Sequence, residues 1–168
     1  MKSAHYCQIS SLEYGYFMGV AEDKRQHLIF IQDTIKRMAG NSFLLKGWSI
    51  TLIIAITSIA VGLDIDLLEG KVTRLYFICI AIFLVLIFWA LDAYYLSQER
   101  AYRGLYGKVS KAEPDKIDYS MDARPFLTGK NSWWSSMFSH VFLVFYGSAL
   151  FLLLLLLGNM IGINVYMK

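Results

Sequence analysis

Three stretches without an acidic residue, a lysine or an arginine constrain this chain more than any other feature: residues 47–63, 75–91 and 131–167. A helix that crosses the hydrocarbon of a bilayer needs about 20 mostly apolar residues. A soluble domain of 168 residues could not bury three such stretches and keep a polar surface. Backbone groups in lipid must be bonded internally, so helices are expected. The predicted fold class is an all-α integral membrane protein with three transmembrane helices plus cytoplasmic helical extensions.

The ends of the uncharged stretches divide the chain. Four segments are predicted: a cytoplasmic N-terminal arm and amphipathic helix at 1–46, the first and second spans with a short outer loop at 47–91, a cytoplasmic helical extension and loop at 92–137, and the third span with an outer C-terminus at 138–168.

Apolar residues at helical spacing predict that the amphipathic helix begins near Glu22. This helix either packs on its neighbours or lies on the membrane surface. A kink is expected at Gly40 and Asn41. Ser132 is the expected N-cap of the last helix.

Basic residues in the flanks predict the orientation. Residues 1–46 contain six and residues 92–140 contain seven, whereas the loop 64–74 contains two beside three acidic residues. Basic segments remain on the cytoplasmic side. The N-terminus and the second connection are therefore expected in the cytoplasm of a multi-pass protein.

The first span carries a stripe of small residues: Thr51, Ala55, Ser58 and Gly62. Small side chains let helices approach closely in lipid. The stripe is predicted to form a helix–helix contact or to line a pore in an oligomer. Both interpretations require a partner helix.

Asp92 lies at the edge of the second span, where a carboxylate is costly unless it is hydrated or paired. Three interpretations stay open: hydration among headgroups, pairing with Arg100 or Arg103 of a neighbouring subunit, and a proton or cation site. In a structure its side chain is expected within hydrogen-bond reach of an arginine, a lysine or a tyrosine hydroxyl. Glu99 and Arg103 are spaced for an ion pair on a helix that continues beyond the membrane.

Four tryptophans at the ends of the spans are the predicted anchors at the membrane interface: Trp48, Trp89, Trp133 and Trp134. No catalytic or phosphate-binding motif appears, so catalysis is not expected. The scattered histidines and Cys7 and Cys79 do not predict a metal site, and no cofactor is expected. Acidic residues dilute the basic segments, so no specific nucleic-acid binding is predicted.

Three sequence stretches resemble small bacterial inner-membrane proteins of the SLATT type: NSFLLKGW at 41–48, LDAYYLSQER at 91–100 and GKNSW at 129–133. That pattern has two spans and a cytoplasmic helix, whereas this sequence has a third span. The resemblance implies a membrane effector that occurs beside anti-phage systems, assembles as a homo-oligomer and permeabilises the inner membrane when a partner senses infection. The expected function is therefore an oligomeric pore-forming or membrane-disrupting effector in the bacterial inner membrane. The alternative is a non-conducting membrane anchor or scaffold that recruits a cytosolic partner or sensor.

Overall fold

The computed structural model describes the backbone of residues 2–62 and 68–166 and the side chains of residues 15–62 and 72–159. These described ranges are mostly helical and contain no strand. The elements in chain order are α1 (Lys2–Gly62), α2 (Leu68–Lys111), the single-turn helices η1 (Pro114–Lys116), η2 (Arg124–Phe126) and η3 (Gly129–Asn131), α3 (Trp133–Met137) and α4 (His140–Tyr166).

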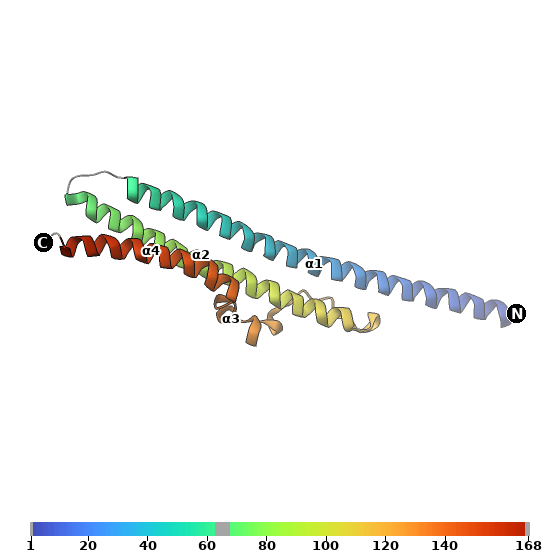
Figure 1. Cartoon of the computed structure of the whole chain (residues 1–168). Coiled ribbons are helices and arrows are strands. Elements are labelled where there is room, and N and C mark those ends of the chain that lie inside the picture. The colour runs from blue at the N-terminus through green and yellow to red at the C-terminus, as the bar shows by residue number, and fades with distance from the viewer. Residues whose placement is uncertain (1, 63–67, 167–168) are drawn as a thin grey trace.

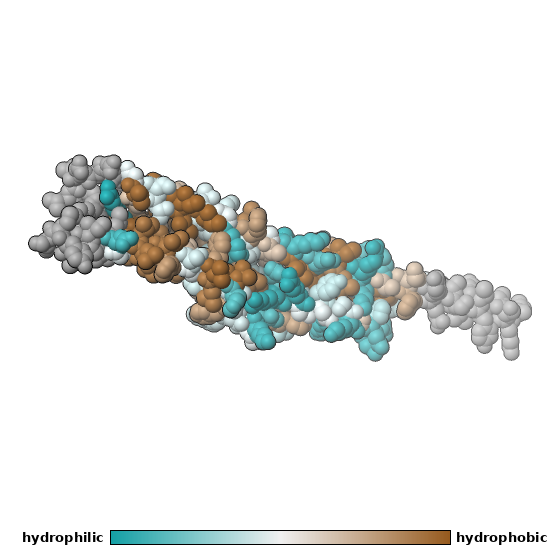
Figure 2. Space-filling model, in the orientation of Figure 1, coloured by the Kyte–Doolittle hydropathy of each residue, from teal (hydrophilic) through white to brown (hydrophobic). Residues whose placement is uncertain are grey.

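The two longest helices, α1 and α2, run antiparallel side by side, and α4 lies along only one part of α2 (Figure 1). We call this part, which holds α4 and the uncharged stretches of α1 and α2, the apolar half. The polar half holds residues 15–46 of α1, residues 92–111 of α2 and the connection 112–139. Hydrophobic side chains dominate the surface of the apolar half, and hydrophilic side chains cover much of the polar half (Figure 2). The molecule therefore changes along its length from three long helices with an apolar surface to two with a polar one.

Among the described residues, three helical segments are long and apolar enough to span a membrane: Gly15–Gly62, Val72–Lys111 and His140–Asn159. Their outer faces expose large apolar side chains, among them Ile54, Phe83, Val144 and Phe151. Apolar patches of this extent on a protein surface mark a contact with lipid or another protein.

Each half has its own core. In the apolar half, α2 and α4 bury Ala81, Val85, Phe88, Ala93, Phe142, Tyr146 and Leu153. In the polar half, Ile31 of α1 packs with Ala101, Leu105, Val109 and Ala123. The end of α2 is also tied to α1, because Lys24 Nζ donates hydrogen bonds to the carbonyls of Ser110 (3.0 Å) and Ala112 (2.7 Å). Of the two predicted settings for the amphipathic helix, packing on its neighbours is the one that the structure contains.

Two helix starts differ from the prediction. α1 begins at Lys2 rather than near Glu22 and continues through Gly40 and Asn41 without interruption. The chain's only prolines lie in the connection after α2, so nothing in α1 removes a backbone donor or forces a break. Ser132 is an N-cap, as predicted, but its side chain accepts from Ser135 N of the short α3. The last helix starts afresh at His140.

Candidate functional site

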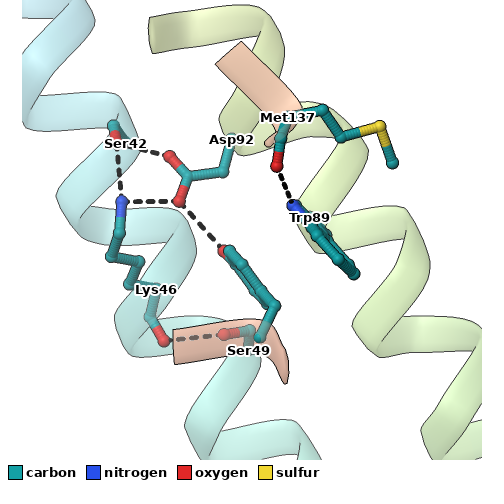
Figure 3. A network of polar contacts seen from close by, with 7 residues as sticks. Ser42, Lys46, Ser49, Trp89, Asp92 and Met137 are labelled. Atoms are coloured by element: carbon teal, nitrogen blue, oxygen red, sulfur yellow. Dashed lines mark hydrogen bonds and ion pairs between the residues drawn. The ribbon is translucent and has the colours of Figure 1, made fainter. Parts of the chain in front are cut away.

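A buried ion pair joins the first two helices where the apolar half meets the polar half (Figure 3). Lys46 Nζ of α1 lies 2.5 Å from Asp92 Oδ2 of α2. Ser42 Oγ, one turn before Lys46, donates a hydrogen bond to Asp92 Oδ1 and accepts one from Lys46 Nζ at 2.8 Å. The Asp92 side chain is fully buried, whereas that of Lys46 keeps 21% of its exposure. The carboxylate is thus neutralised within its own chain.

The third helix completes this cluster through Tyr146, whose hydroxyl donates to Asp92 Oδ2 at 3.1 Å. Tyr146 is fully buried, and its ring stacks on Trp89 with centroids 6.0 Å apart. Lys46 Nζ also lies 4.6 Å from the centre of the Phe142 ring. All three long helices therefore meet at one carboxylate. We call Ser42, Lys46, Asp92 and Tyr146 the junction cluster.

The antiparallel hairpin brings Lys46 and Asp92 together. Lys46 immediately precedes the first uncharged stretch, and Asp92 immediately follows the second. Adjacent antiparallel helices place the start of one beside the end of the next. This placement is a sequence signal for the pair, although among the basic flanking residues Lys46 predicts only the orientation of the chain. Ser42 and Tyr146 carry no comparable signal.

The structure bears on two of the three interpretations of Asp92, hydration among headgroups and pairing. A position in headgroup water is wrong, because the side chain has no exposure. The expected lysine and tyrosine hydroxyl partners are confirmed, and they come from the same chain rather than from a neighbouring subunit. The other residues that were predicted beside Asp92, namely Glu99, Arg100 and Arg103, make their contacts elsewhere in the chain.

Glu99 and Arg103 form the predicted ion pair one turn apart on α2, with Glu99 Oε1 and Arg103 Nη2 2.5 Å apart. Arg100 instead holds the connection before α4. Its guanidinium donates to the Lys130 carbonyl at 3.0 Å and lies 3.3 Å from Ser136 Oγ. These groups hold the polar half together and do not join the junction cluster.

The small-residue stripe Thr51, Ala55, Ser58 and Gly62 is exposed along its whole length. The predicted helix–helix contact is therefore not made by any of the residues that the structure describes. The face of α1 that α2 covers buries Ser49 and Ala60 instead. The stripe faces away from α2 and is free to meet lipid or another molecule.

The four tryptophans divide into two pairs. Trp48 and Trp134 are exposed, as an interface anchor requires. Trp89 and Trp133 use their indole N–H groups inside the chain, where Trp89 donates to the Met137 carbonyl (2.9 Å) and Trp133 to the Ala90 carbonyl (3.0 Å). These two hydrogen bonds fasten α3 to α2.

The polar half carries an open groove between α1 and the connection, lined by Asp23, Gln26, His27, Phe30, Asp33, Thr34, Lys36, Arg37, Tyr119 and Met121. His27 is buried, its Nε2 has no hydrogen-bond partner, and its ring meets Tyr119 edge to face at 5.4 Å. Phe30 remains largely exposed. Apolar and charged groups side by side suit a protein surface better than a small metabolite.

The junction cluster can hold the three long helices together through an ion pair and hydrogen bonds. A buried carboxylate with an ammonium and two hydroxyl partners fixes helices relative to one another. Across the described side chains, no three His, Cys, Asp or Glu residues come close enough to hold a metal ion. Comparison of the chain with protein-family models, with curated proteins and with solved structures found no match.

Proposed function

We propose that this chain is a multi-pass protein of the bacterial inner membrane, with its N-terminus in the cytoplasm and the apolar half in the bilayer. The exposed apolar side chains of α1, α2 and α4 support this placement, because lipid is the solvent that they suit. Basic residues on both segments of the polar half support the orientation.

Cysteine labelling in intact cells tests this orientation. The natural Cys7 and Cys79 are first replaced by serine, and single cysteines are then introduced at Glu69 or Lys116. An impermeant reagent is expected to reach position 69 from outside and position 116 only after permeabilisation. The reverse pattern would contradict the proposal.

The function that we infer is a homo-oligomeric effector that permeabilises the membrane, and the sequence resemblance supplies anti-phage defence as its setting. The proposed assembly rests on one observation: none of the described residues covers the stripe from Thr51 to Gly62. Small residues on a lipid-facing helix favour close helix pairing in a membrane. Among the described side chains, Phe88, Tyr146 and Leu153 fill the space between α2 and α4, so no aqueous path runs there in a single copy. Conduction therefore requires several copies around an axis.

Ion flux tests the effector. Overexpression is expected to depolarise cells, as read by a voltage-sensitive dye, and purified protein is expected to pass ions across liposomes. Ser58→Phe should abolish both effects, because a phenyl ring on the stripe holds neighbouring helices apart or fills the path. Ile59→Phe is the matched control, since Ile59 is exposed beside Ser58 but lies off the stripe. Full flux in Ser58→Phe would overturn the role of the stripe.

A non-conducting anchor for a cytosolic partner is the second candidate, and the groove beside Phe30 favours it. Phe30→Asp should then abolish biological activity while the membrane potential of the cells never changes. Protection from phage without depolarisation, together with no flux in liposomes, would end the pore proposal and leave the anchor.

A further inference from the structure

The groove of the polar half follows one exposed strip of α1. The strip consists of five exposed residues at alternating spacings of three and four: Asp23, Gln26, Phe30, Asp33 and Arg37. This is the spacing at which one helix lies along another. The strip is about 21 Å long at 1.5 Å per residue, and Tyr119 and Met121 of the connection line the opposite wall of the groove.

The α1 wall of the groove offers side chains but no free backbone groups, because the backbone of α1 is hydrogen-bonded within the helix. An extended peptide binds mainly through its backbone, which this wall cannot pair. A helix satisfies its own backbone and needs only side-chain contacts from its groove. A strip of four turns is therefore suited to a second helix.

The centre of the strip is aromatic. Phe30 is 61% exposed and lies seven residues from each end. Beside it, the buried His27 has an Nε2 atom without a hydrogen-bond partner among the described residues, and its ring meets the exposed Tyr119 edge to face. An aromatic centre with a polar rim is the usual anatomy of a protein interface. The middle of an occupying helix should therefore be apolar.

The two ends of the strip carry opposite charges. The neighbouring charged residues are engaged within the chain, in the ion pairs Glu22–Arg25 and Asp33–Lys36 and in the hydrogen bonds of Lys24. Among the described residues, neither Asp23 nor Arg37 forms an ion pair; Arg37 donates a hydrogen bond to the neutral Thr34 Oγ1 at 3.4 Å. The strip thus presents an unneutralised anion at one end and an unneutralised cation at the other.

This charge order distinguishes between possible occupants. Two copies of the chain in one membrane hold α1 parallel, so pairing their strips would place Asp23 against Asp23 and Arg37 against Arg37. Like charges opposite one another disfavour such a complex. A helix that runs antiparallel to α1, acidic at its N-terminus and basic at its C-terminus, meets both charges and also complements its own dipole.

We propose that the groove binds an amphipathic helix of a cytosolic protein, antiparallel to α1, with its acidic first turn beside Arg37, its basic last turn beside Asp23 and apolar side chains on Phe30. The inference rests on the cytoplasmic placement of the polar half proposed above. It names the chemistry of the partner that the anchor would recruit, and it does not depend on ion conduction.

Two synthetic peptides test the site. The matched peptide is a helix of about 18 residues with leucines at the spacing of the strip, glutamate in its first turn and lysine in its last. The exchanged peptide has the same composition with these two charges swapped, and a hydrocarbon staple keeps both helical. Fluorescence anisotropy with the full chain in non-ionic micelles should show roughly fivefold tighter binding of the matched peptide, because each exposed ion pair contributes about a factor of two.

The double variant Asp23→Lys/Arg37→Glu should reverse this preference and bind the exchanged peptide roughly fivefold more tightly. A purely structural role of the two residues would not produce a reversal. Equal affinity of the two peptides for the unmodified chain, a preference that does not reverse, or no binding of either peptide would overturn the proposal.

Phe30→Ala should weaken binding of the matched peptide roughly tenfold, as the loss of a central aromatic anchor does. Phe17→Ala is the matched control, because Phe17 is exposed on α1 to a similar degree but lies outside the groove. Equal weakening by the two variants would contradict the position of the site.

Two further results separate the occupants and the proposals. If Phe30→Ala lowers the oligomer mass in micelles, a second copy of the chain occupies the groove and the partner-helix proposal fails. Peptide binding without charge preference, in a protein that depolarises cells, overturns this inference alone. The expected preference in a protein that passes no ions overturns the pore and leaves the helix site standing.

Discussion

Breaking the ion pair of the junction cluster from either side is expected to destabilise the protein by unequal amounts. Removing one member of a buried pair leaves an uncompensated charge and costs about 3–5 kcal/mol. Lys46→Met leaves the Asp92 carboxylate fully buried with only its hydroxyl partners. Asp92→Asn leaves an ammonium that retains 21% exposure and can still meet water. We therefore expect about 5 kcal/mol for Lys46→Met and about 3 kcal/mol for Asp92→Asn.

The double variant Lys46→Met/Asp92→Asn should be more stable than either single variant, because neither charge remains. Replacement of a whole buried pair by neutral groups is often close to neutral in stability. The double-mutant cycle isolates the coupling between the two side chains. Lys36→Met is the control at the exposed pair with Asp33, and it should cost below about 1 kcal/mol.

Unfolding in mixed micelles, titrated with a denaturing detergent, provides the measurement. Tryptophan fluorescence includes a signal from the junction cluster, because Trp89, one of the four tryptophans, stacks on Tyr146. Circular dichroism follows the helices in the same samples. Costs that simply add in the double variant would refute a coupled buried pair, as would a larger cost for Asp92→Asn than for Lys46→Met.

Two other predictions concern the polar half. Gly104→Ala should destabilise the fold by about 1–3 kcal/mol in the same unfolding assay, because the new Cβ would lie 2.7 Å from Phe126 Cδ1. Gly107→Ala has open space around its Cβ and should be neutral or stabilising. The Arg124 side chain, which hydrogen-bonds to the carboxylate at 2.8 Å, lowers the pKa of Asp122 to about 2. The stabilisation that the low pKa of Asp122 provides is present at pH values above the ordinary carboxyl range and is lost as the pH falls through about 2. Arg124→Ala should raise the midpoint of an NMR carboxyl titration toward about 3.9, and an unmoved midpoint would contradict this cause.

The three long helices could be predicted from the sequence because charge is absent from the uncharged stretches, a signal that needs no knowledge of packing. The full extent of α1 could not. Residues before Glu22 show no clear apolar periodicity, yet no proline interrupts them, and the helix continues from the covered segment. Apolar periodicity marks a buried helix face, so it does not reveal a helical segment that buries no face.

The helix faces that meet were harder to predict than the helices themselves. The first span has small residues on two faces, and α2 covers the one with Ser49 and Ala60 rather than the one with Ser58. Side-chain size alone does not rank these faces, because the choice also depends on how α2 fits against each of them. Tyr146 likewise could be placed beside Asp92 only once the position of α4 along α2 was known.

The uninterrupted course of α1 past the junction cluster joins the two halves of the molecule through one continuous helix. It extends about 40 Å from Gly15 to Ser42 and about 30 Å from Ser42 to Gly62, at 1.5 Å per residue. Because α1 is held on both sides of Ser42, through Ile31 in the polar half and Ala60 in the apolar half, the two parts of the helix are expected to move together with α2. A displacement of the polar half would thus reach the face that carries Thr51 to Gly62, and this coupling would weaken if a flexible break were inserted at Gly40.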